Sequence, residues 1–347
     1  MSRQQIALWT TLALVLGGCG KAEDEAQQTR VERSMKAWLT VELASFRNAA
    51  AELQQAAPTP SGRGWSAEQD ADAIRRMKQA WGRARHAYEV VEGAVAPLFP
   101  DSDTATDARY DDFLAALGAA GDPEPFDEQG VVGVHAIERV LWADAVPRDT
   151  VEFESRLPGY RVAAFPATEA EARSFKERLA AKLVTDIAQL EAQLAPVELD
   201  IAFAFRGLMD LTNEQLEKID RAATGREESR YAQTTLGDLR ANREGCLAAY
   251  RLFQPWLVAR GRTDLDALVM AGFTRLARAY DATPGAAIPR PPDAWSSLAP
   301  KSDHLNTSFG KLFSVVKRET DDKEPGSLSH SLMSVADALG LPKAVLR

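Results

Sequence analysis

Cysteine and histidine are scarce in this sequence, which has only two cysteines and four histidines among its 347 residues. The sequence also lacks the HExxH motif of zinc peptidases, the GxSxG turn of serine hydrolases and a glycine-rich loop for phosphate binding. Cys246 has no sequence context that would activate it as a nucleophile. The commonest motifs for peptide hydrolysis and nucleotide binding are therefore excluded.

Positive charge is in the minority, because 41 Lys and Arg residues face 50 Asp and Glu residues and leave a net charge of -9. No cluster of basic residues forms, and a surface that binds nucleic acid needs one. We therefore expect no nucleic-acid partner, and an acidic surface suits cations better. The apolar fraction of 45% is sufficient for one large domain or two smaller ones.

Long apolar runs are missing apart from residues 6–16, which are too few to cross a bilayer as a helix. This segment is typical of a secretory signal peptide, and the LGGC string that ends at Cys19 matches a bacterial lipobox. That match implies a lipoprotein signal peptide over residues 1–18 and lipidation of Cys19. Polar residues 19–29 then predict a flexible tether. The chain would be lipid-anchored in the bacterial cell envelope and face the periplasm. The two residues after Cys19 do not resemble the inner-membrane retention signal, which slightly favours the outer membrane.

Apolar residues recur at three- and four-residue spacing through most of the chain, and no segment alternates as a strand does. The pattern predicts an all-α domain over residues 30–347. Residues 148–168 show no sustained period and predict a long loop. We expect two packed helical bundles, one on each side of this loop, over about residues 30–147 and 169–340. The predicted helices cover residues 31–57, 66–96, 130 to about 147, 169–195, 201–223, 229–260, 265–280, 305–317 and 328–339.

The most informative stretch is residues 130–142, GVVGVHAIERVLW, which combines an apolar helical face with His135 and Glu138. Three residues apart on a helix, these two side chains lie on one face, with Cβ atoms about 5 to 6 Å apart. Burying an imidazole and a carboxylate beside an apolar stripe is costly unless they are paired or coordinate an ion. They could satisfy each other as an ion pair, or they could bind one cation together.

Glu89 and Glu92 repeat this three-residue spacing in the string RARHAYEVVE, within the predicted helix 66–96. Two such pairs on facing helices could close one site, as in helical bundles whose carboxylates and histidines project inward. Carboxylate and imidazole ligands suit iron, manganese, zinc or copper. The alternative for Glu89 and Glu92 is a solvated helix face, and His86 in the same string is expected at the surface.

Four strings resemble motifs of the imelysin-like family, which includes iron-uptake lipoproteins of the EfeO and EfeM type. Residues 130–142 are similar to its GFHRIEKALW signature, and the YEVVE string around Glu89 is similar to its YERIEP segment. DARYDD, residues 107–112, resembles DxRVDD, and RYAQTTLGDLRAN, residues 230–242, resembles RYSHTDLWDFQAN. The resemblance covers most of residues 30–282.

Membership of this family would imply two helical bundles and a transition-metal site. Its motifs imply His135, Glu138, Glu89 and Glu92 as metal ligands, together with Asp111 as the preferred aspartate of the DARYDD string. Gln233 stands where the family has histidine, which argues against a histidine ligand there. Asp238 and Asn242 in the same string could instead bond to each other across one helical turn.

Three functions remain open. The resemblance implies a lipid-anchored metal-binding protein that assists iron uptake, with iron as the first candidate and zinc or copper as alternatives. Its partners would be the metal ion, the membrane and an iron permease or other uptake component. A metallopeptidase is the second function, since imelysin takes its name from a reported peptidase activity, but the missing second histidine disfavours it. A non-catalytic structural or protein-binding lipoprotein is the third, because of Gln233.

Overall fold

The computed structural model describes residues 3–341, with side chains from residue 22 onward, and contains no β-strand within that range. The prediction of an all-α protein is confirmed. The helices of the first half of the chain are α1 (Arg3–Ala56), α2 (Ala71–Leu98), α3 (Pro100–Asp107), α4 (Tyr110–Leu117), α5 (Gly133–Leu141) and α6 (Arg148–Glu154).

The second half continues with helices close to the predicted ones. They are α7 (Glu169–Ser174), α8 (Ala180–Leu194), α9 (Ile201–Asp220), α10 (Thr235–Ala259), α11 (Thr263–Asp281), α12 (Ser308–Glu319) and α13 (Leu328–Leu339). A π-helical turn, Phe175–Leu179, joins α7 to α8, and short 3-10 turns lie at Gly118–Ala120 and His304–Asn306. Within residues 3–341, no helix is both long enough and apolar enough to cross a membrane.

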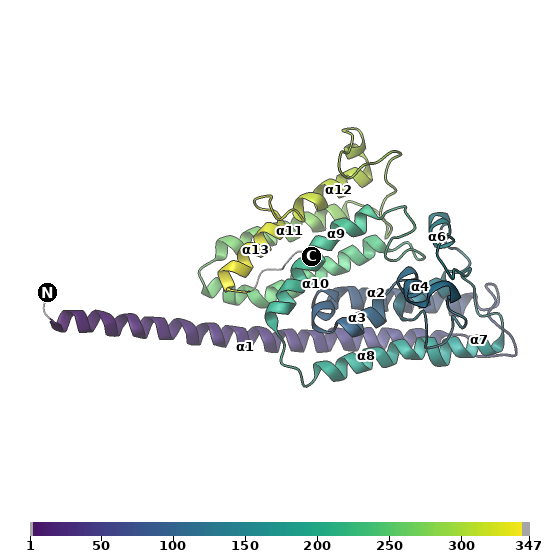
Figure 1. The fold of residues 1–347 in the computed structure, drawn as a ribbon, viewed down its shortest axis with the longest axis horizontal. Helices are drawn as coiled ribbons and strands as arrows, with labels where there is room; N and C mark the ends of the chain where they lie inside the picture. Colours follow the sequence, from purple (N-terminus) through teal and green to yellow (C-terminus); the bar gives the residue numbers. More distant parts are fainter. Residues whose placement is uncertain (1–2, 342–347) are drawn as a thin grey trace.

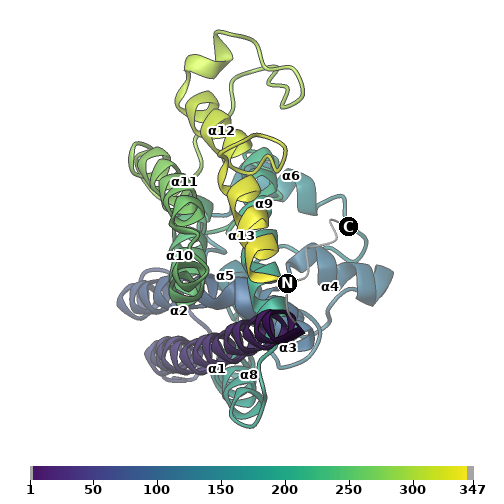
Figure 2. The same ribbon diagram turned by 90° about the vertical axis from the view of Figure 1, so that its left-hand side faces the viewer.

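The helices stack in layers, with α8 along one edge and α1 between α8 and α2 (Figures 1 and 2). Helices α9 and α10 pack on the other side of α2, and α11, α12 and α13 cover these in turn. Two apolar cores result, and α1 and α2 contribute to both. One core contains Phe46 of α1 and Trp81 of α2, and the other contains Leu39 of α1 and Val91 of α2.

The boundary between the two bundles differs from the predicted one at residues 169–194. The predicted boundary assigns this segment to the second bundle, but α8 packs against α1, and Leu183 and Ile187 are buried in the core around Trp81. The periodicity identifies the apolar face of this helix but not the helix that covers it. Only its last residues, Leu190 and Leu194, reach the core of the second bundle.

The predicted tether, residues 19–29, is helical and belongs to α1. Its residues are mainly Ala, Glu, Gln and Lys, which are good helix formers, so a helix can continue through a polar segment. Asp24 also accepts hydrogen bonds from Trp256 Nε1 at 3.0 Å and from Arg260 Nε at 2.7 Å. The side chain of Cys19, the expected lipidation site, lies outside the described residues.

The predicted loop at residues 148–168 contains a helix that its composition did not reveal. Pro147 precedes α6 in a position where its fixed φ and missing N–H are tolerated. Glu154 at the end of α6 is buried and contacts Arg139 at 3.5 Å. The predicted start of the second helix is also too early: Ser66 caps a single turn through Gln69, and α2 itself begins at Ala71.

Helices α9 and α10 approach the backbone of α2 closely at two glycines. A Cβ added to Gly207 would lie 1.8 Å from the carbonyl oxygen of Gly93, and one added to Gly245 would lie 1.8 Å from that of Val90. Neither position has room for any side chain. These contacts hold α9 and α10 against the part of α2 that carries Glu89 and Glu92.

Candidate metal centre

Charged side chains are buried together where α2, α5, α9 and α10 meet the segment that precedes α10. A buried charge is costly unless it is paired with an opposite charge or bound to an ion. Carboxylates outnumber cations in this cluster, which we call the acidic cluster. It consists of Glu89, Glu92, Asp107, His135, Glu138, Glu228 and Asp238, with Arg85 and Lys218 as its cations.

Arg85 is the central cation of the acidic cluster. It lies one helical turn before Glu89 on α2 and pairs with it, and it also pairs with Asp107 at the end of α3. Its guanidinium reaches Glu228 at 3.2 Å and Asp238 at 3.6 Å. One arginine thus holds four carboxylates from four segments of the chain.

Lys218 of α9 is the second cation. Its Nζ lies 3.2 Å from Glu92, 2.9 Å from Glu228 and 3.6 Å from Glu89. Asn242 of α10 completes the contacts, because its side-chain amide donates to Glu89 Oε2 at 2.6 Å and to Glu92 Oε2 at 2.8 Å. Glu89 and Glu92 are therefore buried and not part of a solvated helix face.

His135 and Glu138 lie on α5, whose residues are all buried. His135 Nδ1 is 2.8 Å from Glu138 Oε2, as the three-residue spacing predicts. Glu138 Oε1 accepts hydrogen bonds from the backbone N–H groups of Tyr231 at 2.9 Å and Ala232 at 2.8 Å. Both oxygens of Glu138 are thus engaged, one in orienting the imidazole and the other in fastening the segment before α10.

The second imidazole nitrogen faces Asp107. His135 Nε2 lies 3.4 Å from Asp107 Oδ1, and this fully buried atom has no hydrogen-bond partner of good geometry among the described residues. The structure thereby joins His135 to Glu89 through Asp107 and Arg85. Such a carboxylate–histidine arrangement, with the far nitrogen left for another group, is typical of histidines that bind metal.

A cavity of about 430 Å³ opens beside the acidic cluster. Asp103 and Asp107 line it from α3, and Tyr88 donates a hydrogen bond to Asp103 from α2. Glu214 and Lys218 line it from α9. The full lining is Glu92, Asp103, Thr104, Asp107, Ala108, Arg109, Asp112, Glu214, Glu217, Lys218, Arg221 and Glu228.

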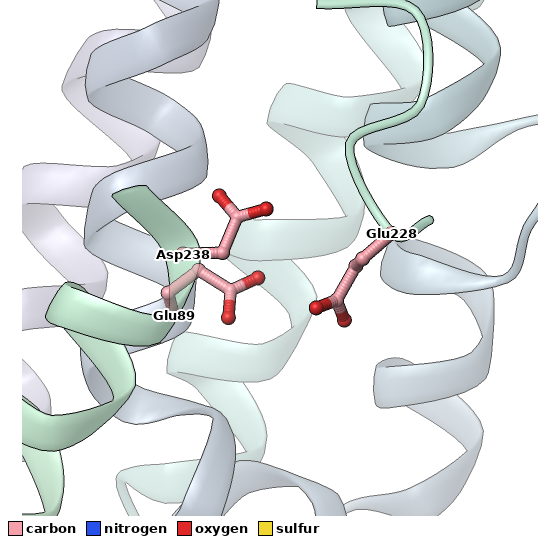
Figure 3. Close-up of side chains that lie close together, drawn as sticks. All are labelled: Glu89, Glu228 and Asp238. Carbon is pink, nitrogen blue, oxygen red and sulfur yellow. The ribbon is translucent and has the colours of Figure 1, made fainter. Parts of the chain in front are cut away.

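Two groups of three carboxylates bring one oxygen each within 4.8 Å of one another, and Glu228 belongs to both. Figure 3 shows the first, in which Glu89 of α2, Asp238 of α10 and Glu228 lie close together. The second consists of Glu92, Asp107 and Glu228 and lies at the cavity wall. Oxygens bound to one first-row metal ion are at most about 4.4 Å apart, so either group is close to a coordinating arrangement.

Asp111 lies in a different group of charges. Its carboxylate is 2.8 Å from Arg230, which is also 3.8 Å from Glu154, and Tyr231 donates a hydrogen bond to Glu154. Within residues 3–341, Asp111 does not line the cavity and joins neither carboxylate group. The preference for Asp111 over Asp107 is thus not supported by where the structure places them.

Two other polar residues singled out in the sequence also lie away from the acidic cluster. Gln233 adopts a positive φ of 56° in the turn before α10, and its side-chain amide donates to the carbonyl of Arg230 at 2.8 Å. His86 is exposed on α2 and lies 3.8 Å from Glu244, as expected of a surface residue.

Asp238, a member of the acidic cluster, does not pair with Asn242 as the sequence suggested. Its carboxylate instead accepts a hydrogen bond from Ser229 Oγ at 2.6 Å.

Burial and neighbouring charges divide the carboxyl groups into two classes. Burial raises the pKa of Glu89 well above its usual value, and it raises the pKa of Asp238 and of Asp103 to about 7. Burial acts on Asp107 and Glu228 as well, but Arg85 and His135 lower the pKa of Asp107, while Lys218 and Arg85 lower the pKa of Glu228. Asp107 and Glu228 thus remain ionised when the others take up protons.

These shifts predict that the metal-free protein loses stability as the pH rises from 5 to 8. A carboxyl whose pKa is raised by folding binds its proton more tightly in the folded state, so its contribution is present at low pH and lost as pH rises through about 7. The expected loss is on the order of a few kcal/mol, since one unit of pKa shift corresponds to about 1.4 kcal/mol. Thermal unfolding with a chelator present would measure it.

The control for this pH dependence is Asp238→Asn, which removes one titrating carboxyl. Its unfolding midpoint should change less between pH 5 and 8 than that of the wild type. Below about pH 4 both proteins should lose stability, because Asp107 and Glu228 owe their lowered pKa values to ion pairs that protonation removes. A midpoint that rises between pH 5 and 8 would contradict the assignment.

Several residues of the acidic cluster were not identified from the sequence. Arg85 stands one turn before Glu89, and Lys218 one turn after Glu214, and such pairs are ordinary on exposed helices. The feature of the sequence that could have indicated the burial of Arg85 is the apolar residues around it in α2. No feature of the sequence indicated that Glu228 would belong to the cluster, because its position depends on the turn before α10 that is hydrogen-bonded to Glu138.

Comparison with known proteins agrees with these features. The sequence matches the Imelysin family, also designated peptidase family M75, over residues 40–301. It is 25% identical over 203 residues to the iron uptake system component EfeO of Escherichia coli strain K12 and to that of Shigella flexneri. The match covers 58% of this chain and 43% of either relative, so this chain spans less than half of their length.

A solved structure has the same arrangement of helices. The chain is similar to an imelysin-like protein from Psychrobacter arcticum 273-4, with a TM-score of 0.54 and 11% sequence identity. The alignment covers 92% of this chain and 94% of the other. At this identity the likeness shows the fold alone, and it extends over nearly the whole of both chains.

Proposed function

The chain belongs to the imelysin family, and from that premise we propose that it binds a transition-metal ion and assists iron uptake at the bacterial cell envelope. The observation that carries the proposal is the buried His135 Nε2, which faces Asp107 beside the cavity and has no hydrogen-bond partner of good geometry among the described residues. The similar EfeO proteins are named as iron uptake components.

The residues present fit such an ion. Asp107, Glu92 and Glu228 offer oxygens within 4.8 Å of one another, and His135 adds an imidazole nitrogen 3.4 Å from Asp107. Oxygen donors with one imidazole suit iron, and they also accept zinc or copper. We assign these four residues as ligands. Glu89, which is fully buried, is a further candidate.

We assign Glu138 a positioning role, because both of its oxygens are already hydrogen-bonded. It fixes the imidazole so that Nε2 points at Asp107, and it fastens the segment that carries Glu228. We also propose that Asp111 is structural, as the partner of Arg230.

Metal titration of four matched variants tests the ligand assignment. His135→Ala and Asp107→Asn should each weaken binding by about 10- to 100-fold or more. His86→Ala, an exposed histidine, and Asp111→Asn, an aspartate four residues from Asp107, should leave it nearly unchanged. The measurement is calorimetric titration with Zn²⁺ in air and with Fe²⁺ under anaerobic conditions.

Each alternative gives a different result in this experiment. If Asp111→Asn weakens binding as much as Asp107→Asn does, Asp111 is a ligand after all. If the wild-type protein cleaves peptides only with metal and Asp107→Asn abolishes cleavage, the protein is a metallopeptidase. If the wild type binds neither metal, the structural or protein-binding function is favoured.

We propose further that Cys19 carries a lipid anchor that holds the protein at the membrane, facing the periplasm, where an iron permease or another uptake component would be its partner. The support is the LGGC string that ends at Cys19. Cys19→Ala should move the protein from the membrane fraction to the soluble fraction or leave an uncleaved precursor. Fractionation with lipid labelling measures this, and unchanged labelling in the variant would exclude the anchor.

A further inference from the structure

Lys218 occupies the place among the carboxylates that a bound cation would need. Its Nζ lies 2.9 Å from Glu228 Oε2, 3.2 Å from Glu92 Oε2 and 3.6 Å from Glu89 Oε2. The side-chain oxygen of Asn242 accepts a further hydrogen bond from it at 3.0 Å. Four oxygens from two helices and a loop thus surround one ammonium group, and the lysine is almost completely buried.

The ammonium and a metal ion cannot share these oxygens. Glu92 and Glu228 belong to the carboxylate group at the cavity wall, and Lys218 contacts both. A metal ion bound there would lie within a few Å of Nζ, and two like charges at such a distance in a partly buried site repel each other strongly. Binding of the ion therefore requires Nζ to leave.

The cavity offers a second position for the ammonium. Glu214 lies one helical turn before Lys218 on α9, and both residues line the same cavity of about 430 Å³. Residues four apart on a helix can pair, and the lysine stem has four rotatable carbons. Glu214 forms no ion pair in this structure among the described residues, so its carboxyl group is available to Nζ.

We propose that Lys218 is a built-in counter-ion, which holds Glu92 and Glu228 together in the metal-free protein and swings toward Glu214 when a metal ion replaces it. This inference rests on the proposed metal-binding function and adds how that site is regulated. The lysine keeps the empty site folded, and it also weakens metal binding because the ion must displace it. A protein that passes its ion on to a partner benefits from both effects.

Three variants separate charge from structure in a Zn²⁺ titration of the whole chain. Lys218→Gln removes the competing charge and should tighten Zn²⁺ binding by at least about tenfold, given the strength of the repulsion that it relieves. Lys218→Arg keeps the charge and should not tighten binding. Glu214→Gln removes the second position and should weaken Zn²⁺ binding several-fold. It should not lower the unfolding midpoint of the metal-free protein, because burial already raises the pKa of Glu214 to about 8 and so favours a neutral group there.

A second measurement on the wild-type protein does not depend on any variant folding. Acetylation of lysines by acetic anhydride, quantified by mass spectrometry, should increase several-fold at Lys218 when Zn²⁺ saturates the protein. Lys182, which pairs with Asp186 on α8 at a distance from the cavity, is the internal control and should not change. Unchanged or reduced labelling of Lys218 would overturn the proposed displacement.

The two proposals fail in different ways. If the wild type and all three variants bind no Zn²⁺ or Fe²⁺, the metal-binding function itself is wrong. If the wild type binds Zn²⁺ but Lys218→Gln binds it equally or more weakly, the metal site stands and the counter-ion is excluded. In that case Lys218 would be a structural partner of Glu92 and Glu228.

Discussion

Glu138→Ala should destabilise the metal-free protein by about 3 to 5 kcal/mol, because it removes one partner of a fully buried network. The substitution leaves His135 Nδ1 and the backbone N–H groups of Tyr231 and Ala232 without the carboxylate that they contact. Each unsatisfied buried group costs free energy of its own. The midpoint of urea unfolding, with a chelator present, measures the loss.

The same change should also weaken metal binding, although Glu138 is not assigned as a ligand. Without its carboxylate the imidazole of His135 is free to rotate, and the segment that carries Glu228 is no longer fastened to α5. Substitutions of residues that orient ligands typically cost about 10- to 100-fold in affinity. Zn²⁺ titration of the folded variant measures this effect separately from stability.

Glu138→Gln separates the two roles of Glu138, which are to orient His135 and to hold the segment before α10. A glutamine can still accept hydrogen bonds from Tyr231 and Ala232 through its amide oxygen, but its NH₂ group cannot accept one from His135 Nδ1. This variant should therefore keep most of the stability and lose most of the metal affinity. Glu152→Ala is the control for both readouts and should change neither. The carboxylate of Glu152 is half exposed and pairs with Arg156 on the surface. If Glu138→Ala weakens Zn²⁺ binding without any loss of stability, Glu138 is a ligand and not a positioning residue.

The sequence predicted the helices well because apolar periodicity is a local property of the chain. Helix α13 begins and ends at Leu328 and Leu339, as expected, and α11 differs by two residues at its start and one at its end. The clear misses are the helical residues 19–29 and the short helices α3, α4 and α6. All except α4 lie in polar segments without a strong apolar stripe. Contacts between distant segments, such as Asp24 with Arg260, stabilise α1 there, and no local pattern contains that information.

The candidate site was predictable only in part. The spacing of His135 and Glu138 and of Glu89 and Glu92 placed each pair on one helical face, and all four residues belong to the acidic cluster. The choice between Asp107 and Asp111 depends on the break between α3 and α4, which turns the two aspartates toward different partners. Lys218 could not be identified, since its burial depends on how α9 packs on α2.

The largest effect on packing is expected at Gly245, where α10 touches the backbone of α2. A Cβ at this position would lie 1.8 Å from the carbonyl oxygen of Val90, and no side-chain movement can relieve a contact with backbone. Inserting atoms into a packed core costs about 1 to 3 kcal/mol, and more when the backbone must move. The gain in helix propensity from glycine to alanine, about 1 kcal/mol, offsets only part of this cost.

Gly245→Ala should therefore destabilise the protein by about 2 kcal/mol or more, and it should move Asp238 and Asn242, on the same helix, away from Glu89. Gly237→Ala is the matched control, because it lies on α10 too and no described atom lies within 4 Å of its added Cβ. That change should stabilise the protein by up to about 1 kcal/mol. Urea unfolding and Zn²⁺ titration of both variants test these expectations. Equal stabilities of the two variants would mean that α10 can shift without cost. Undiminished metal affinity in Gly245→Ala would mean that the position of α10 does not set the geometry of the acidic cluster.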